Sequence, residues 1–302
     1  MGKVEIRMDF KEELKKYQEI VNKHLEEYIN KEKCPEELLN QSVEYSLMAG
    51  GKRLRPILVI ATYELFKKDI ETCMSYAIAL EMIHNFSLIH DDLPGIDNDD
   101  FRHGKPTNHK QFNEATAILA GDRLLNNAYI VISEELKKSE KEELPKKIKI
   151  LEEFSKAVNQ MIVGEFVDTE FEGKQISEKY LEYIHKNKTG ALIILAVRMG
   201  AMLANASEED LKRLTSYAEK IGLAFQIKDD ILSEEGNQEI LGKPVGNDKR
   251  LEKCTYVSKY GLEKAKEILN GIIKEATEEL EIYGEKAQFL IELANYIENR
   301  NK

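Results

Sequence analysis

Apolar residues recur every three or four positions along almost the whole chain, which is the spacing of one face of an α-helix. The first such stripe is formed by Phe10, Leu14, Tyr17, Val21, Leu25 and Tyr28. Similar patterns cover residues 36–48, 57–66, 72–92, 115–136, 146–170, 178–203, 208–232 and 262–283. Alternating runs of β-branched residues and Ser/Pro-rich linkers are absent from the 302-residue sequence. The sequence therefore predicts one large all-α bundle, with a single domain over residues 1–302.

The charge balance limits the partners that the chain can have. The formal net charge is −11, which argues against nucleic acid or an anionic membrane as the main partner. The longest apolar stretches, such as residues 191–197, are too short to span a bilayer, and residues 1–30 lack the pattern of a signal peptide. Cys34, Cys73 and Cys254 are odd in number and widely spaced, which is typical of free thiols in a reducing cytoplasm. Any anionic substrate must then be held by a few local cations or by metal.

A dense group of aspartates follows the apolar run at residues 86–90. It begins with Asp91 and Asp92 and puts five aspartates within ten residues. Carboxylates at the C-terminal end of a helix oppose its dipole, and a bound cation removes this conflict. Hard oxygen ligands favour Mg²⁺ bridged to substrate phosphates. Because Pro94 should end the helix and fold the chain, we expect Asp97 to return towards Asp91.

A second acidic pair, Asp229 and Asp230, also follows an apolar run. Gln226 and Ser233 lie three to four residues from this pair, so the four side chains share one helical face. Each acidic pair is followed twelve residues later by Gly-Lys-Pro, at residues 104–106 and 242–244. One such pair alone is more often a solvated cluster, but the repetition favours two acidic sites that face one cavity.

The basic counterpart is the stretch Gly-Gly-Lys-Arg-Leu-Arg-Pro at residues 50–56. It places Lys52, Arg53 and Arg55 in a glycine-rich turn before an apolar helix. Glycine allows close backbone approach, whereas lysine and arginine bind phosphate as a point charge and as a fork. Taken alone, the stretch is equally consistent with an ordinary turn that leads into a helix. It lacks the spacing of a Walker loop, and neither a nucleophile–His–acid triad nor a zinc motif is evident.

These motifs together resemble the trans-isoprenyl diphosphate synthases, the polyprenyl synthetase family, and most of all its bacterial farnesyl diphosphate branch. The resemblance extends from about residue 40 to residue 262 and follows the motif order of the family. It rests on residues 51–56, the aspartate-rich block through His109, Lys-Thr-Gly-Ala-Leu at 188–192, Phe225-Gln226, and the second block through Tyr256. It implies a cytoplasmic all-α homodimer of the isoprenoid synthase type, with a deep central cavity between the two aspartate motifs.

Site residues follow from this resemblance by position. The residues similar to the isopentenyl diphosphate site are Gly51, Lys52, Arg55, His84 and His103. Those similar to the allylic diphosphate contacts are Arg102, Lys188, Thr189, Gln226 and Lys243. The implied ligands of three Mg²⁺ ions, or of Mn²⁺, are Asp91, Asp92, Asp97 and Asp229, with Asp230 beside them. The oxygens of Thr189 and Gln226 resemble the groups that face the allylic cation.

Two residues depart from the family pattern. The family usually has a second arginine after Arg102, where this chain has His103, and it usually ends the second motif in aspartate, where this chain has Ser233. We expect His103 to weaken the binding of isopentenyl diphosphate or to make it pH-dependent, because imidazole titrates near neutrality. Ser233 removes an outer carboxylate, so we expect lower metal affinity rather than inactivity.

The implied reaction is metal-assisted ionisation of an allylic diphosphate, condensation with isopentenyl diphosphate, and loss of a proton. The aromatic bulk of Phe86, with a two-residue insertion in the first aspartate motif, resembles the stop for a farnesyl (C15) product. Helical projection puts Ser87 within about 40° and His84 within about 20° of Asp91, but Phe86 well to one side. The assignment of Phe86 and Ser87 to chain length therefore rests on the resemblance.

Other functions stay open at this point. A geranyl or geranylgeranyl synthase would use the same scaffold. The departures at His103 and Ser233 favour a non-catalytic partner subunit, whereas the complete acidic pairs argue against one. A terpene cyclase would not need Lys52 and Arg55 for isopentenyl diphosphate.

Overall fold

The computed structural model describes residues 8–171, 174, 176–235 and 255–300, and helices make up nearly all of this part. The predicted all-α class is confirmed, and most observed helix bounds lie within three residues of the periodic patterns. The helices are α1 (Met8–Lys31), α2 (Glu37–Leu47), α3 (Leu54–Glu64), α4 (Glu71–Asp91), α5 (Asn108–Gln111), α6 (Glu114–Lys137), α7 (Leu144–Glu170), α8 (Glu178–Ile184), α9 (Ala191–Leu203), α10 (Glu208–Glu235), α13 (Tyr256–Tyr260), α14 (Leu262–Glu278) and α15 (Gln288–Asn299).

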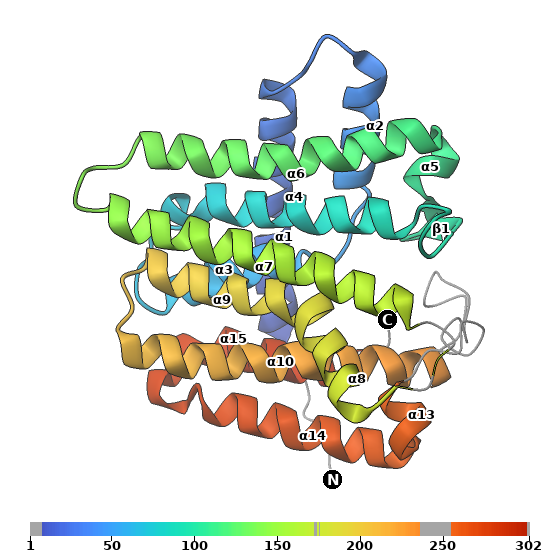
Figure 1. Ribbon diagram of the computed structural model, residues 1–302. Coiled ribbons are helices and arrows are strands. Elements are labelled where there is room, and N and C mark those ends of the chain that lie inside the picture. The colour runs from blue at the N-terminus through green and yellow to red at the C-terminus, as the bar shows by residue number, and fades with distance from the viewer. Residues whose placement is uncertain (1–7, 172–173, 175, 236–254, 301–302) are drawn as a thin grey trace.

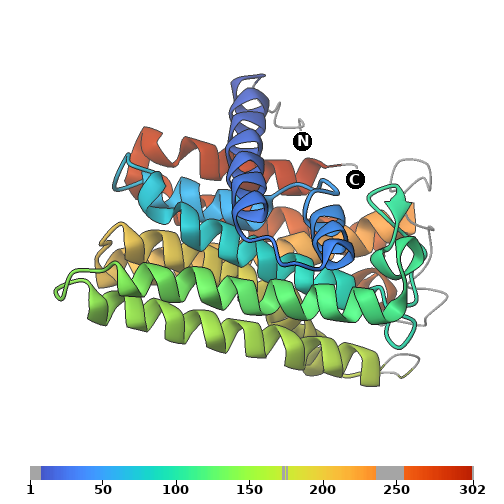
Figure 2. The same ribbon diagram turned by 90° about the horizontal axis from the view of Figure 1, so that it is seen from above.

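Most of the long helices lie side by side, and α1 crosses them at a steep angle (Figures 1 and 2). Most residues of α4 and α9 are buried, so these two helices lie inside the bundle. The C-terminal ends of α4, α7 and α10 are at the same end of the bundle (Figure 1). This arrangement brings together segments that are far apart in the sequence. Among the described helices, none combines the length and the apolar character needed to cross a membrane.

The predicted stripe on the first helix is the face that α1 buries. Phe10, Val21 and Leu25 are almost fully buried, and the ring of Phe10 packs against Phe289 of α15 with 5.2 Å between centroids. The burial of one such side chain contributes about 2 kcal/mol to stability. Tyr17, in the same stripe, donates a hydrogen bond to Glu64 at the end of α3. The hydrophobic stripe therefore fixes α1 across α3 and α15.

One pair of short strands interrupts the helical pattern. Strands β1 (Phe101–Arg102) and β2 (Lys105–Pro106) pair in an antiparallel hairpin. The two turn residues, His103 and Gly104, have φ values of 51° and 74°, as a two-residue hairpin turn requires. Residues 93–114 lie between two of the predicted helices, and strands of two residues are too short to show alternation in the sequence.

A π-helical segment, η1 (His185–Gly190), divides the helix that was predicted over residues 178–203. Its backbone lies very close to two neighbours. A Cβ atom on Gly164 of α7 would be 2.3 Å from the amide nitrogen of Lys188, and one on Gly222 of α10 would be 3.3 Å from Gly190. π-Helical turns inside α-helices occur frequently at functional sites, and here the segment contains Lys188 and Thr189. The remaining irregular element is the 3₁₀ segment η2 (Glu281–Ala287).

Candidate active site

The first aspartate group lies where α4 ends. The chain turns after Asp92, and the amide of Asp97 donates a hydrogen bond of 2.8 Å to the carbonyl oxygen of Asp91. The predicted return of Asp97 is thus confirmed. Burial and the nearby Glu165 carboxylate raise the pKa of Asp91 to about 7, and Asp97 acts in the same direction. A group of carboxylates that repel one another in a buried place favours a bound cation.

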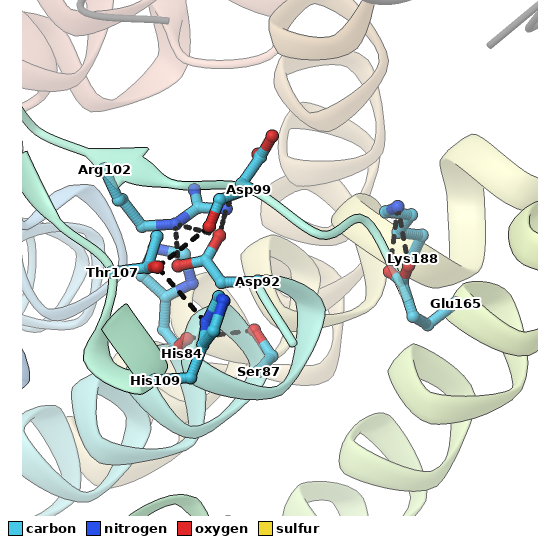
Figure 3. A network of polar contacts seen from close by, with 9 residues as sticks. All are labelled: His84, Ser87, Asp92, Asp99, Arg102, Thr107, His109, Glu165 and Lys188. Carbon is cyan, nitrogen blue, oxygen red and sulfur yellow. Dashed lines mark hydrogen bonds and ion pairs between the residues drawn. The ribbon is translucent and has the colours of Figure 1, made fainter. Parts of the chain in front are cut away.

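Asp92 at the end of α4 and Arg102 on strand β1 form a forked ion pair (Figure 3). The Nε atom of Arg102 lies 2.9 and 2.8 Å from the two carboxylate oxygens of Asp92, and one Nη lies 2.5 Å from Oδ1. Asp99 approaches the same guanidinium at 4.0 Å. Burial lowers the pKa of Arg102, but the hydrogen bond to Asp92 and the charges of Asp92, Asp91 and Asp99 together outweigh burial and raise it. Asp92, predicted to bind metal, and Arg102, predicted to bind the allylic diphosphate, therefore bind each other in this structure.

Lys188 lies between two carboxylates of α7. Its ammonium is 2.9 Å from Glu165 and 2.7 Å from Asp168 (Figure 3 shows Lys188 and Glu165). Burial opposes the charge of Lys188, but Asp168 and Glu165 reverse this effect and raise its pKa. Glu165 and Asp168 were missed by sequence reasoning. Acidic residues are common on amphipathic helices, and the one local signal was Gly164, which admits the backbone of Lys188.

The second half of the site is formed by η1 and α10. The hydroxyl of Thr189 donates a hydrogen bond of 2.8 Å to the side-chain oxygen of Gln226. Asp229, one turn further along α10, lies 2.5 Å from Arg300, whose guanidinium also stacks 4.2 Å from the centre of the Phe225 ring. Arg300 was also missed, because nothing around it in the sequence marks a partner in α10. Of the residues predicted for the allylic end, Thr189 and Gln226 are therefore in direct contact.

Neighbouring Asp230 has a different role. It is buried, and its carboxylate accepts a hydrogen bond of 2.8 Å from the amide of Tyr256, so it caps the first turn of α13. The half-buried Ser233 lies one turn after Asp230 on α10. Lys243 and the second Gly-Lys-Pro lie outside the described residues, as does Cys254, whereas Cys34 and Cys73 are free thiols.

Two of the predicted isopentenyl diphosphate residues, Gly51 and His103, meet at the hairpin turn. A Cβ atom on Gly51 would lie 3.3 Å from the ring of His103, so these two residues are in contact. Burial lowers the pKa of His84 well below its usual value, and the charges of Arg55 and Arg102 act in the same direction. The buried Nδ1 of His84 and Nε of Arg55 make no hydrogen bond to the described residues. Buried donors without partners indicate a place that a ligand can fill.

The charge of Arg55 is influenced by both acidic groups. Burial lowers the pKa of Arg55 to about 10, and the carboxylates of Glu81, Asp229 and Asp91 oppose this effect. Asp91 comes from α4 and Asp229 from α10, so one guanidinium lies within electrostatic reach of both aspartate motifs. A small hollow of about 30 Å³ lies beside the hairpin, between residues of α2, the end of α4 and His103. The deep central cavity stays a prediction.

The fit of a metal depends on the donors that are present. In the described part of the chain, no three acidic, histidine or cysteine side chains are close enough to hold an ion by themselves. Mg²⁺ does not need such a cage, because it keeps several waters and binds through one or two carboxylates plus substrate phosphates. Asp91 and Asp97 meet this requirement, since their oxygens are hard donors at one turn of the chain.

The proposed chain-length residues are on two faces of α4. Phe86 is buried and packs edge-on against the ring of His90, with 4.9 Å between centroids. Ser87 donates a hydrogen bond of 2.9 Å to the carbonyl of His84, one turn earlier on α4 (Figure 3). The roles of Phe86 and Ser87 in chain length stay a prediction.

A helical bundle with this set of motifs defines a class of prenyl-transferring enzymes, and the chain belongs to the polyprenyl synthetase family, whose model matches residues 36–289. It is 44% identical to the farnesyl diphosphate synthase of Geobacillus stearothermophilus over 85% of this chain and 86% of that protein. It is also 44% identical to the geranylgeranyl diphosphate synthase of Cyanophora paradoxa, over 86% of this chain and 87% of that protein. The structure of geranylgeranyl pyrophosphate synthetase from Pyrococcus horikoshii matches with a TM-score of 0.86 and 31% identity, over 97% and 99% of the two chains.

Proposed function

We propose that this chain is a short-chain prenyl transferase that condenses isopentenyl diphosphate with dimethylallyl or geranyl diphosphate to give farnesyl diphosphate. The observation that carries the proposal is the position of Arg55. It has a buried Nε without a hydrogen bond to the described residues, and it is within electrostatic reach of Asp91 and Asp229. A cationic site between two acidic groups suits two diphosphates, of which one is held through divalent ions and the other by side chains directly.

The allylic diphosphate is assigned to the acidic side. Asp91, Asp92, Asp97 and Asp229, with Asp230 beside them, are the proposed Mg²⁺ residues, for three ions in all, and Mn²⁺ is an alternative. When bound, the ions neutralise the charge that develops on the departing diphosphate. Lys188, Arg102 and Lys243 are the proposed direct contacts. Lys188 and Arg102 must then exchange carboxylate oxygens of Asp168, Glu165 and Asp92 for phosphate oxygens.

Isopentenyl diphosphate is assigned to the basic side, with Gly51, Lys52, Arg55, His84 and His103 as its contacts. Gly51 has a φ of 108°, a conformation that glycine adopts readily, and its lack of a side chain leaves room for the ring of His103. The low pKa of His84 keeps it neutral near pH 7, so its ring can donate one hydrogen bond without adding charge. The alkene of this substrate attacks the allylic cation.

Thr189 and Gln226 are the proposed residues nearest to the allylic cation. Their mutual hydrogen bond fixes their oxygens in one place, and partial negative charge there stabilises a developing positive charge. Bulk water must be excluded from this place, because it would convert the cation to an alcohol. The released diphosphate is the proposed acceptor of the final proton, so the chain itself needs no nucleophile.

The C15 product is the proposal for chain length, with Phe86 as the floor and Ser87 beside it. A geranyl or geranylgeranyl synthase remains the alternative, since relatives with both farnesyl and geranylgeranyl names have similar identity. A non-catalytic subunit would not need the ordered Thr189–Gln226 pair, and a cyclase would not need Arg55.

We also propose a homodimer that consists of one domain per chain and works in the cytoplasm. The support for a dimer is the exposed apolar surface of α6, where Ile118, Leu119 and Ile130 are 42%, 56% and 39% exposed. Exposed apolar groups of this kind often mark a protein interface. One continuous core cluster supports a single domain, and the free thiols of Cys34 and Cys73 agree with a reducing compartment.

The test is an assay of the purified protein with isopentenyl diphosphate, an allylic diphosphate and Mg²⁺. We expect a C15 diphosphate, loss of activity with a chelator, and its return with Mg²⁺ or Mn²⁺. A C10 or C20 product would support the alternative synthases. A cyclic hydrocarbon made without isopentenyl diphosphate would identify a cyclase, and complete inactivity would indicate a partner subunit.

A further inference from the structure

Arg53 lies between the proposed substrate contacts Lys52 and Arg55, but its side chain is buried and binds groups of the chain itself. Only 3% of the residue is exposed. Its three guanidinium nitrogens are bound to three groups of the chain: Nη1 to Glu81 at 2.7 Å, Nη2 to the carbonyl of Leu47 at 2.6 Å, and Nε to Asn22 at 2.9 Å. Because each guanidinium nitrogen already binds a group of the chain and the residue is buried, Arg53 is not presented to a phosphate as Lys52 and Arg55 are proposed to be.

The backbone of Arg53 is in a left-handed conformation, with φ 52° and ψ 30°, directly before the first turn of α3. This conformation is uncommon for residues other than glycine and persists only when the surroundings impose it. The surroundings here come from α1, where two residues one helical turn apart hold the turn. Asn22 binds the side chain of Arg53, and Gln18 donates a hydrogen bond of 3.1 Å to the carbonyl of Lys52. Side chains of α1 therefore help to hold this turn in place.

Glu81 of α4 is the second part of this arrangement, and it is 2% exposed. Its Oε1 accepts hydrogen bonds from Arg53 and, at 3.3 Å, from Asn85. Its Oε2 and the Nε of Arg55 are both buried without hydrogen-bond partners among the described residues. Of the neighbouring carboxylates, Glu81 has the largest favourable effect on the charge of Arg55. One buried carboxylate therefore serves two arginines, one paired with it directly and the other left for a ligand.

We propose that Arg53 and Glu81 are positioning residues for isopentenyl diphosphate, because their buried ion pair holds the turn that presents Lys52 and Arg55. This inference rests on the proposed function, which assigns Lys52 and Arg55 to that substrate. The pair has no contact with substrate in this arrangement. The pair keeps Arg53 from competing for the diphosphate. It also fixes the backbone from which the side chains of Lys52 and Arg55 extend.

A purely structural role would have a different signature. If the pair only stabilised the bundle, its loss would lower the melting temperature and reduce active protein, while the KM values of the remaining active enzyme would not change. If the pair positions the basic turn, its loss acts selectively on isopentenyl diphosphate, because the allylic contacts Lys188, Thr189 and Gln226 belong to η1 and α10. The two roles are therefore separated by the ratio of the two KM values.

The experiment compares Arg53→Met, Arg53→Gly and Glu81→Gln with the wild-type enzyme. For Arg53→Met and Glu81→Gln we expect the KM for isopentenyl diphosphate to rise about tenfold or more, with the KM for geranyl diphosphate within about twofold of wild type. Arg53→Gly removes the backbone conflict but also the side chain, so we expect the same increase. An unchanged KM in Arg53→Gly would show that backbone conformation alone matters and would overturn the proposal.

A matched control is Arg198→Met. Arg198 forms a similar forked pair with Glu153 of α7, at 2.8 and 2.7 Å, towards the other end of the bundle from Lys188. Its loss should lower the melting temperature while both KM values stay constant. Asn22→Ala removes a single hydrogen bond to Arg53, and we expect a KM increase of about threefold for isopentenyl diphosphate alone. This milder variant decides the question if Arg53→Met fails to fold.

Two results would overturn the inference. One is a folded Arg53→Met or Asn22→Ala enzyme with an unchanged KM for isopentenyl diphosphate, and the other is an equal rise of both KM values. Failure of the proposed function is distinguishable, because it would appear in the wild-type protein as no condensation and no calorimetric binding of isopentenyl diphosphate. The proposal is supported if the KM for isopentenyl diphosphate alone rises in the Arg53 and Glu81 variants, while both KM values of Arg198→Met stay at the wild-type level.

Discussion

The amide nitrogen of Asp97 lies 2.8 Å from the carbonyl oxygen of Asp91. This single backbone hydrogen bond closes the chain behind Pro94 and brings two carboxylates, six residues apart, to one place. A continuous helix could not do so, because positions six residues apart face different directions. The end of α4 therefore becomes an acidic corner, and the pKa of Asp91 rises because of burial and the nearby Glu165.

Replacement of Asp91 tests the proposed metal role. We expect Asp91→Ala to lower kcat by about 10³ or more, because charge stabilisation of the leaving group is lost. The melting temperature should not fall, because the substitution also removes the repulsion of Asp91 by the carboxylates of Glu165 and Asp97. Asp100→Ala is the control, because Asp100 is exposed and pairs with Lys110 at the surface. Activity near the wild-type level in Asp91→Ala would contradict the assignment.

The product length should depend on the volume of Phe86. We expect Phe86→Ala to give products longer than C15, because removal of the buried ring leaves space beside α4 for a longer tail. Phe86→Leu keeps part of this volume and should give a smaller shift. The products are dephosphorylated and separated by chromatography against C10, C15 and C20 standards. An unchanged C15 profile from folded Phe86→Ala would exclude Phe86 as the floor.

Dimer formation can be tested on α6. Leu119 is 56% exposed, and a charge at the centre of an apolar interface is costly. We therefore expect Leu119→Glu to shift the mass measured by light scattering from two chains towards one. Ile282→Glu adds the same charge at a site on η2 that is 64% exposed, and it should leave the mass unchanged. A wild-type protein that is monomeric at all concentrations would refute the proposed homodimer.

Acid should destabilise the protein through His185, which lies beside Tyr256. Burial lowers the pKa of His185 in the folded state to about 4, below its ordinary value of 6.5. Between these values the unfolded chain binds the additional proton, so stability is present above pH 6.5 and is lost as the pH falls towards 4. The expected loss between pH 7 and pH 5 is about 2 kcal/mol in the free energy of unfolding. His185→Phe should remove this part of the loss in denaturant titrations, and an identical pH dependence would contradict the assignment.

The difference between prediction and structure is clearest around Lys188. The apolar pattern over residues 178–203 continues without a break, so a single helix was expected, but η1 inserts a π-helical segment there. The insertion depends on Gly164 and Gly222, which come from other helices and let their backbones approach. The partners of Lys188 likewise come from α7, and no local pattern could reveal them.

Asp229 and Asp230 show the same limit at the level of single side chains. Helical spacing placed both on one face, yet Asp229 meets Arg300 whereas Asp230 caps α13. Neighbouring residues on a helix differ by about 100° in direction, so the packing of α13 and α15 decides what each one contacts. The sequence alone determined the helical class, the acidic and basic motifs and the turn at Pro94, because these depend on local periodicity and backbone restriction. Only the tertiary structure decided which charges meet, since ion pairs such as Arg53–Glu81 join residues whose proximity depends on the packing of the whole bundle.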